Sequence, residues 1–487
     1  MTTLTVPLPS HADRRAPQIR SSGRGARRIA VRMALPRVTG WLIALASGGR
    51  LLSAMSALRP QRVAAFAVAS LVSLPALAAL PSPPQDATLK AVVLLSRHGM
   101  RGPTVATRCS GPDDTRCLDA VAHDPWPDLD VSAGHLTASG YDRVVTMGRF
   151  YRAHYAEAGL LPAQGCPAPG TTAFRSDAVE RTTMTAGAIS DGMFPGCNPS
   201  RLEITPRLYE GPACGFEEAR AAKAAQALAG GSWVDLAQGP LKEPLAELDS
   251  VLGRFKPAAC KAAGAPAECS LATIPISAAN RGPIGIASQP AEQFLMQYGG
   301  GLAAGEVAWG RLPDVTGKPL AEAIGYVNAV HATSDRMSYM PEYTARKKGS
   351  PVLYPVLRAL QAAVEGRGAP FTFFASHDDL ILNVAGMLDL SWQLESYAPF
   401  QVPPGGAVAF EVWQHGRTPL IRLVYYAQTI QQLHDDTPLT AAQPPAAAVL
   451  APPGCKPDAT GACTWTAFRQ LATQKIEMAC VDPKRAE

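Results

Sequence analysis

Residues 89–103 read Leu-Lys-Ala-Val-Val-Leu-Leu-Ser-Arg-His-Gly-Met-Arg-Gly-Pro and combine a strand pattern with a cluster of basic side chains. The first seven are short, β-branched and nearly all apolar, which indicates a strand buried on both faces. Directly after this strand come Arg97, His98 and Arg101. Open α/β sheets bind ligands at the carboxyl ends of their strands, and guanidinium groups match phosphate oxygens. A chance match to Arg-His-Gly-x-Arg-x-Pro is on the order of 10⁻⁴, so the stretch predicts a phosphate site with an imidazole placed to attack phosphorus.

A second polar pair follows another apolar run. Residues 371–376 read Phe-Thr-Phe-Phe-Ala-Ser and predict a buried strand, and His377-Asp378 comes directly after them. His-Asp pairs are common, and His123-Asp124 in the same chain follows no strand and is interpreted as structural. The placement after a strand mirrors the first motif. Asp378 is therefore the candidate proton donor to an alkoxide leaving group, and His377 a further donor to phosphate oxygens.

A third candidate, Arg181, stands near the start of a helix predicted over residues 178–190. Backbone N–H groups and the helix dipole favour anions at this end of a helix. An arginine here is by itself more often solvated, or paired with Glu180 or Asp177. Together with the two motifs above, Arg181 becomes a candidate phosphate-binding residue.

Other catalytic or nucleotide-binding signals are weak. The glycine-rich residues 299–305 follow a helical segment and lack both the P-loop lysine and the Gly-x-Gly-x-x-Gly spacing, so they are interpreted as a loop that ends a helix. The chain has no Gly-x-Ser-x-Gly and no Cys-x-x-Cys, and its other histidines show no metal-ligand spacing. The sequence therefore predicts no metal site.

The order of periodic segments predicts an α/β fold. A helix is expected over 135–161 with Thr137 as its N-cap, and a β-hairpin over 407–426. The middle of the chain has helical spacing at 216–256, 292–298 and 320–330. We expect a central, mostly parallel sheet flanked by helices, formed by residues 85–200 and 346–487. A mainly α-helical domain would be inserted over 201–345, with the active site in the cleft between the two domains.

The positive charge of the chain lies at its N-terminal end. The 487 residues hold 45 Lys+Arg and 40 Asp+Glu, a formal charge of +5, and are 47% hydrophobic, which is a globular composition. Residues 1–62 contain eleven Arg, no Lys, one Asp and no Glu, so they carry +10 and the remainder carries −5. The net positive charge of the whole chain therefore predicts neither a nucleic-acid partner nor membrane binding for the folded part.

Residues 55–78 have the layout of a cleaved secretory signal peptide. Residues 55–62 are a positive segment, 63–74 an uncharged apolar run, and Ala76-Leu-Ala78 a small-x-small cleavage site. A membrane anchor is the alternative, but the apolar run is shorter than the ~20 residues that span a bilayer. We expect a periplasmic protein without stable membrane association, and residues 1–54 as an unstructured or non-native extension that precedes the true start.

The cysteines agree with export. They number ten and all follow residue 78, at positions 109, 117, 166, 197, 214, 260, 269, 455, 463 and 480. Three pairs, 109/117, 260/269 and 455/463, are close enough in sequence to close short loops. In an oxidising compartment the even number predicts five disulfides.

With these motifs, the chain resembles the histidine acid phosphatases, branch 2 of the histidine phosphatase superfamily, and most of all the bacterial periplasmic phytases and glucose-1-phosphatases. The likeness extends from about residue 89 to residue 480. It includes Leu136-Thr137-x-x-Gly140, Val307-Ala-Trp-Gly310 and Pro403-Pro-Gly-Gly406. The resemblance implies hydrolysis of small phosphomonoesters, such as glucose 1-phosphate or phytate, without a cofactor or metal, since arginines neutralise the developing charge.

The resemblance also implies residue roles. His98 would be the nucleophile that forms a phosphohistidine, and Asp378 would be the proton donor. The phosphoryl oxygens would be bound by Arg97, Arg101, Arg181 and His377. The implied disulfides are Cys166–Cys197, Cys214–Cys480, Cys260–Cys269 and Cys455–Cys463, which leaves Cys109 and Cys117 for each other.

Three departures from the family pattern concern the substrate. Val105 stands where such phytases carry Lys, Asp379 where the family usually has Thr or Ser, and Thr183 where phytases can carry Arg. Each change lowers the positive potential, which should weaken a many-phosphate ligand more than a monoester. Thr104, Asp379 and Glu292 are candidate substrate-pocket residues, although Glu292 fits equally well as a surface acid on a helix.

Two other functions remain open at this point. A phosphotransferase or mutase would share the Arg-His-Gly start, although mutases of this superfamily are usually cytoplasmic. A non-catalytic phosphate-ligand binder is the other alternative, and the intact His98 and Asp378 argue against it.

Overall fold

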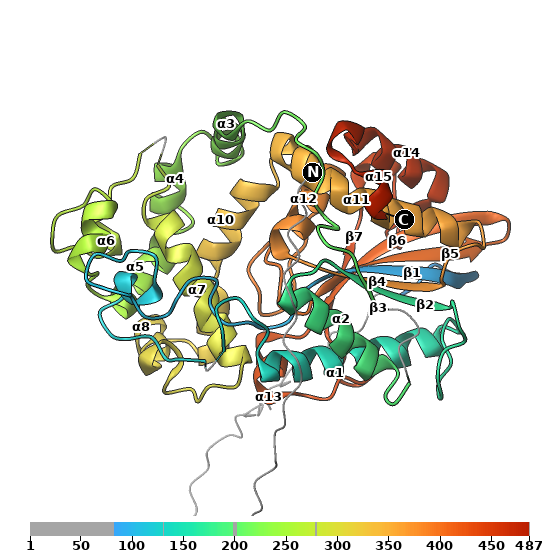
Figure 1. Ribbon diagram of the computed structural model, residues 1–487, viewed down its shortest axis with the longest axis horizontal. Helices are drawn as coiled ribbons and strands as arrows, with labels where there is room; N and C mark the ends of the chain where they lie inside the picture. Colours follow the sequence, from blue (N-terminus) through green and yellow to red (C-terminus); the bar gives the residue numbers. More distant parts are fainter. Residues whose placement is uncertain (1–81, 130, 198–201, 278–279, 487) are drawn as a thin grey trace, which may run out of the picture. The chain divides into compact units, whose positions relative to one another are not determined.

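A mixed β-sheet lies between helices in the right-hand half of Figure 1. The computed structural model describes residues 82–129, 131–197, 202–277 and 280–486. The predicted N-terminal extension and signal peptide lie outside these residues. The strands are β1 Ala87–Arg97, β2 Thr172–Ser176, β3 Leu202–Ile204, β4 Phe371–Ser376, β5 Ala407–His415, β6 Thr418–Ala427, β7 Ala446–Leu450 and β8 Ala462–Thr464.

The strand order is β3-β2-β4-β1-β5-β6-β7, and β8 pairs with β6. The four strands β3, β2, β4 and β1 pair in parallel, whereas β5 to β8 add antiparallel pairings on the other side of β1. The predicted hairpin is the antiparallel pair β5–β6. The predicted α/β class, with parallel strands at its centre, is confirmed.

Helices cover both faces of the sheet (Figure 1). On one face lie α1 Ala138–Glu157 and α2 Glu180–Met193, and on the other lie α11 Glu342–Val364, α12 Asp378–Leu388 and α14 Trp465–Lys475. Side chains of β1 alternate between these two cores: Val92 and Leu94 pack with α1 and α2, and Val93 and Leu95 with the opposite helices. All four are at most 1% exposed, and burial of each such side chain contributes about 1.5–3 kcal/mol.

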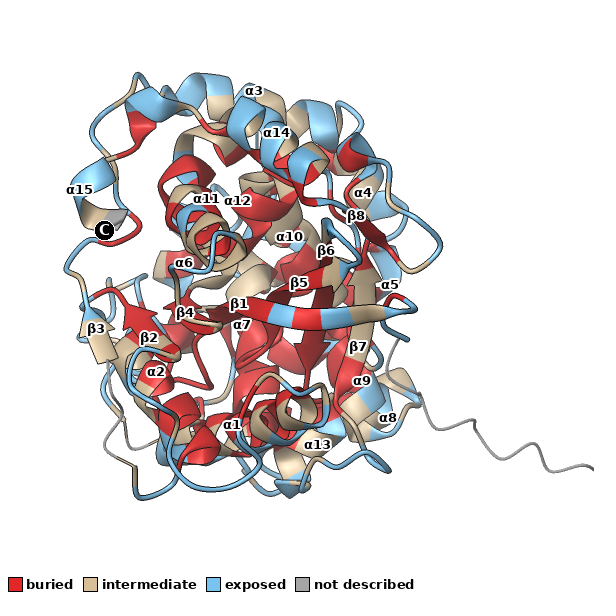
Figure 2. Ribbon diagram, turned by 90° about the vertical axis from the view of Figure 1, so that its right-hand side faces the viewer, coloured by how far each residue is buried: buried red, intermediate tan, exposed pale blue. Residues whose placement is uncertain are grey.

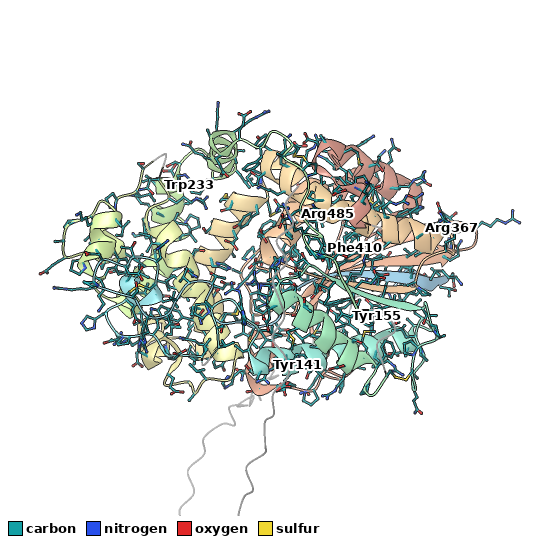
Figure 3. The ribbon with its side chains drawn as sticks, in the orientation of Figure 1. Tyr141, Tyr155, Trp233, Arg367, Phe410 and Arg485 are labelled. Carbon is teal, nitrogen blue, oxygen red and sulfur yellow. A yellow bond between two sulfur atoms is a disulfide. The ribbon has the colours of Figure 1, made fainter. Side chains whose placement is uncertain are left out.

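The sheet is mostly buried, as the apolar run at residues 89–95 predicts for a central strand. Figure 2 shows most of the sheet in the colour of buried residues. Phe410 of β5 is buried and lies 6.1 Å from Phe468 of α14 between ring centroids. By contrast, Arg367, in the turn before β4, extends outward at the edge of the molecule (Figure 3).

The middle of the chain is helical, as predicted. It contains α3 Glu218–Leu228, α4 Trp233–Gln238, α5 Lys242–Leu252, α6 Pro257–Ala262, α7 Pro283–Gly299, α8 Leu312–Thr316, α9 Leu320–Val327 and α10 Ala329–Tyr339. None of the described residues from 205 to 370 lies in a strand of the sheet. The domain boundaries placed at residues 200 and 345 stay predictions.

The remaining elements are short. They are the helices α13 Ile430–Asp435 and α15 Pro483–Ala486 and the 3₁₀ helices η1 Leu118–Val121, η2 Leu271–Thr273, η3 Val307–Gly310, η4 Pro453–Cys455 and η5 Met478–Cys480. Within the described part of the chain, we find no helix with the length and hydrophobicity that a membrane span requires.

All five predicted disulfides are present. They join Cys109–Cys117, Cys166–Cys197, Cys214–Cys480, Cys260–Cys269 and Cys455–Cys463. Four of them close loops between neighbouring cysteines in the sequence. The exception joins Cys214 to Cys480 and ties the start of the helical region to the C-terminal end of the chain. No cysteine of the chain is left as a free thiol.

Candidate active site

The two polar motifs meet because β1 and β4 are parallel neighbours. Arg97, the last residue of β1, is level with Ser376, the last residue of β4. The His98 backbone N–H donates to the Ser376 carbonyl over 2.9 Å and holds the two strand ends in register. Gly99 follows, where a Cβ atom would lie only 2.7 Å from Val144 Cγ2 and 2.9 Å from the Gly140 carbonyl oxygen. Glycine at this position therefore lets the turn after β1 pack against helix α1.

His98 is held in one tautomer. Its Nδ1 lies 2.8 Å from the Gly99 carbonyl oxygen, which can only accept, so Nδ1 carries the hydrogen and Nε2 keeps its lone pair. The side chain is 1% exposed. Burial, followed by the positive charges of Arg97 and Arg101, lowers the pKa of His98 well below its ordinary value. This lowered pKa favours the neutral imidazole.

A buried carboxylate joins the two arginines of the first motif. Glu292 of α7 accepts from Nη2 of Arg97 and, over 3.0 Å, from Nη2 of Arg101. Burial alone would raise the pKa of Glu292, but Arg101 and Arg97 bring it well below its ordinary value. Glu292 is 5% exposed, so the interpretation as a surface acid is wrong. It lies against the arginine side chains and fixes their guanidinium groups relative to each other.

Asp378 begins α12 and faces the same arginine. Its Oδ2 lies 2.6 Å from Arg97 Nη2, and its Oδ1 accepts from the Asp379 backbone N–H over 3.0 Å. Burial opposes ionisation, but Arg97 and Arg101 lower the pKa of Asp378 well below its ordinary value. Next to it, burial and the charge of Asp378 raise the pKa of Asp379 to about 6. The ion pair with Arg97 and the lowered pKa thus favour the ionised form of Asp378.

His377 is held between two charged partners. Arg181, near the start of α2, donates to His377 Nδ1 over 3.2 Å, and His377 Nε2 donates to Asp177 Oδ2 over 3.0 Å. The other oxygen of Asp177 accepts from the Thr182 hydroxyl and from the Val179 backbone N–H. The rings of His377 and His98 are 5.6 Å apart between centroids. Asp177 was not predicted as a site residue, although it stands just before the helix that carries Arg181.

Most of the predicted site residues line a pocket of about 540 Å³, whereas Arg97 is 1% exposed and is not among the lining residues. Its lining contains His98, Arg101, Thr104, Asp177, Arg181, His377, Asp378 and Asp379, among others. Two of the predicted substrate-pocket residues, Thr104 and Asp379, are therefore present, whereas Glu292 is not among the lining residues. An adjoining cavity of about 1510 Å³ shares Tyr209, Glu210, Asp379 and Leu380 with this pocket. It extends between α12 and the helices α3, α7, α10 and α11.

One group of side chains has the spacing of metal ligands. Ligand atoms of Glu292, His331 and Asp378 lie within 4.8 Å of one another. However, the guanidinium of Arg97 already pairs with both carboxylates. A metal ion here would have to displace that fixed positive charge, so we assign no metal to the group.

The fold and the two motifs define the class of protein. The family model of the histidine phosphatase superfamily (branch 2) matches residues 88–225 and 322–426. These ranges contain both strand-end motifs and Arg181. The chain belongs to this family, and the resemblance inferred from its sequence motifs is confirmed.

The chain is also similar to individual proteins of known name or structure. The chain is 30% identical to the phytase AppA of Escherichia coli (strain K12) over 419 residues, which cover 80% of this chain and 93% of that protein. It is 27% identical to a glucose-1-phosphatase of Providencia rettgeri over 407 residues, with coverages of 80% and 93%. Among solved structures, Hafnia alvei phytase in complex with tartrate is 28% identical with a TM-score of 0.70, covering 82% of this chain and 100% of that one.

Proposed function

We propose that this protein is a periplasmic phosphatase that hydrolyses small phosphomonoesters through a phosphohistidine at His98. The observation that carries the proposal is the buried, neutral imidazole of His98, with Nε2 unprotonated among Arg97, Arg101 and Arg181. The relatives named as phytase and glucose-1-phosphatase support the same reaction class. The periplasmic location depends on the predicted signal peptide over residues 55–78 and is part of the proposal.

Three arginines would bind the phosphoryl group. The Nε–H groups of Arg97, Arg101 and Arg181 are buried and have no hydrogen-bond partner among the described residues. Buried donors without acceptors cost free energy, and phosphoryl oxygens would supply the missing acceptors. Because guanidinium groups stay charged, they would also neutralise the negative charge that develops in the transition state.

In the first step, His98 Nε2 would attack phosphorus while the bond from phosphorus to the leaving oxygen breaks. Asp378, in its carboxylic acid form, would give its proton to that oxygen. In the ligand-free site Asp378 is ionised because it pairs with Arg97. A phosphoryl group that takes Arg97 as its partner removes this counter-ion and adds negative charge, so it raises the pKa of Asp378 and favours the acid.

In the second step, water would attack the phosphohistidine. Asp378, now a carboxylate, would accept a proton from this water as the nitrogen–phosphorus bond breaks and inorganic phosphate forms. His377 would donate to a phosphoryl oxygen only after Arg181 leaves Nδ1 for the phosphate and Nδ1 gains a hydrogen. The Asp177 carboxylate at Nε2 would then compensate the positive charge of the ring.

Release of inorganic phosphate distinguishes a hydrolase from a phosphotransferase or mutase. We expect purified protein at acidic pH to release phosphate from glucose 1-phosphate in a one-to-one ratio with glucose, since water takes the phosphoryl group in the proposed second step. Adding an alcohol acceptor, such as ethanol, should divert only a minor fraction of the phosphate. If most phosphate appeared on the alcohol or on another carbon of the sugar, the hydrolase proposal would be wrong.

Glucose 1-phosphate should be preferred over phytate. Asp379 lines both the phosphate pocket and the adjoining cavity, and Val105 supplies no positive charge. Asp379, with its pKa raised to about 6, carries its negative charge above that pH. At pH 7 we expect kcat/KM to be at least roughly tenfold higher for glucose 1-phosphate, the order of effect of one or two nearby charges, and we expect a smaller preference at pH 5. Val105→Lys together with Asp379→Thr should raise kcat/KM for phytate selectively. Asp314→Asn should not, because Asp314 is exposed on α8 and lines neither the pocket nor the adjoining cavity. A wild-type preference for phytate would contradict this prediction.

A further inference from the structure

A second polar pair lies behind Asp378 on helix α10. His331 and Asp335 are four residues apart and therefore on one face of the helix, with His331 Nε2 3.4 Å from Asp335 Oδ2. The same nitrogen lies 3.6 Å from Glu292 Oε1, and His331 Nδ1 lies 3.0 Å from the Ser288 hydroxyl. The ligand atoms of His331 and Asp378 are within 4.8 Å. None of the reaction steps proposed above uses this pair.

Asp335 connects the site to the large cavity. It lines the 1510 Å³ cavity, whereas His331 is 8% exposed and lies between Asp335 and the buried Glu292. The charged and titratable groups that face Asp335 are His331 and Tyr339 on α10, Glu292 on α7, Asp378 on α12 and Arg97 on β1. Burial, followed by the charges of Asp378 and Glu292, raises the pKa of Asp335 to about 7, although His331 and Arg97 oppose this shift.

The steps proposed above do not say where Asp378 obtains its proton, and the His331–Asp335 pair can supply it. Asp378 must be a carboxylic acid when it meets the leaving oxygen, but in the ligand-free site it is ionised against Arg97. We propose that Asp335 stores the proton while Asp378 is paired with Arg97, and that His331 passes it to Asp378 when a phosphoryl group binds Arg97. This inference rests on the proposed function, because it assigns the source of the proton for the same reaction.

The transfer balances without any other reactant. The Asp335 carboxylic acid gives its proton to His331 Nε2, which is 3.4 Å away. Because the ligand atoms of His331 and Asp378 lie within 4.8 Å rather than at hydrogen-bond distance, the ring then turns toward Asp378, and Nε2 gives the same proton to an Asp378 carboxylate oxygen. No bond between heavy atoms forms or breaks, and the net change is an ionised Asp335 and a neutral Asp378. After hydrolysis Asp378 has regained a proton from water. When phosphate leaves and Arg97 pairs again with Asp378, that proton returns to Asp335.

The test is the pH dependence of Asp335→Asn with two leaving groups. The probes are ethyl phosphate, whose leaving alkoxide requires a proton, and p-nitrophenyl phosphate, whose leaving phenolate requires it much less. In a plot of kcat/KM against pH for ethyl phosphate, we expect the decline on the alkaline side (the alkaline limb) to move to lower pH by about one unit or more in Asp335→Asn. At pH 6 the loss should be roughly tenfold for ethyl phosphate and much smaller for p-nitrophenyl phosphate.

Matched variants separate storage of a proton from a structural role. Glu218→Gln removes another carboxylate from the lining of the same cavity and should leave the limb in place. Asp335→Glu keeps a titratable carboxyl and should restore most of the wild-type profile. His331→Gln removes the carrier, should shift the limb as Asp335→Asn does, and serves as the test if Asp335→Asn does not fold.

An active, folded Asp335→Asn enzyme with an unmoved limb, or with equal losses for both substrates, would overturn the inference. The proposed function would survive that result if wild-type protein releases phosphate and its turnover depends on His98. If wild-type turnover did not depend on His98, the proposed function itself would fail, and the two failures are therefore distinguishable.

Discussion

His98→Ala is expected to abolish turnover, with kcat lower by roughly 10⁴-fold or more for every phosphomonoester. The methyl group cannot accept a phosphoryl group, so no phosphohistidine forms and a weakly activated water must attack directly. The loss should be equally complete with p-nitrophenyl phosphate, because a good leaving group does not replace the missing nucleophile. The arginines remain, so phosphate should still bind as a competitive ligand.

Rapid acid-free quenching with radiolabelled substrate measures the intermediate. Wild-type protein should yield a phosphoenzyme that survives base and is lost in acid, as a nitrogen–phosphorus bond requires, and His98→Ala should yield none. His123→Ala is the matched control, because His123 is exposed and also precedes an aspartate in sequence. A phosphoenzyme stable in acid but not in base would identify a different nucleophile.

Asp378→Asn should have the second largest effect, and the effect should depend on the leaving group. Asparagine has nearly the same shape but cannot supply the proton, so kcat for ethyl phosphate should fall by about 10²–10⁴-fold. With p-nitrophenyl phosphate the loss in the first step should be much smaller. Steady-state kinetics with a series of leaving groups would therefore show a steeper dependence on leaving-group pKa in the variant.

Asp389→Asn is the control on the same helix. Asp389 lies at the opposite end of α12 with a φ of 54°, a conformation that asparagine also adopts readily. We expect its kinetics to match the wild type. Equal losses for good and poor leaving groups in Asp378→Asn would contradict the role as a general acid and would indicate that Asp378 only orients Arg97.

Local sequence patterns were sufficient for much of the fold. The strand over 371–376 has the predicted bounds, and Thr137 caps α1 by accepting from the Gly140 backbone N–H. Both signals are contained in a few consecutive residues. The helix expected over 320–330 is instead two helices, α9 and α10, that meet at Asn328.

Elements with conflicting local signals were not predicted. Helix α11 contains Pro351 and Pro355, which are unfavourable in a helix interior, and its buried apolar face overrides them. Strand β2 is five residues long and includes the polar Thr172 and Arg175. Its position beside β4 comes from pairing with a segment far along the chain, which no short window contains.

The residues of the site also divide into those that a local sequence pattern predicts and those that it does not. Arg97, His98 and His377-Asp378 were found because each motif directly follows a recognisable strand. The contacts of Glu292 with the two arginines, and of Asp177 with His377, join residues about 200 positions apart. His331 and Asp335 carried only their spacing of four residues as a signal, and nothing local connects them to Asp378.

The pairing of β1 with β4 has a consequence for how the chain folds during and after synthesis. Half of the reactive centre is made early in synthesis and half late, and neither half binds phosphate in the proposed manner without the other. Such non-local pairing makes folding slow compared with helical bundles. Catalytic activity therefore requires that both motifs are present and that β4 has docked against β1. A truncated or nicked chain that carries only one motif should be inactive. During refolding, activity should recover at the rate at which β4 docks against β1.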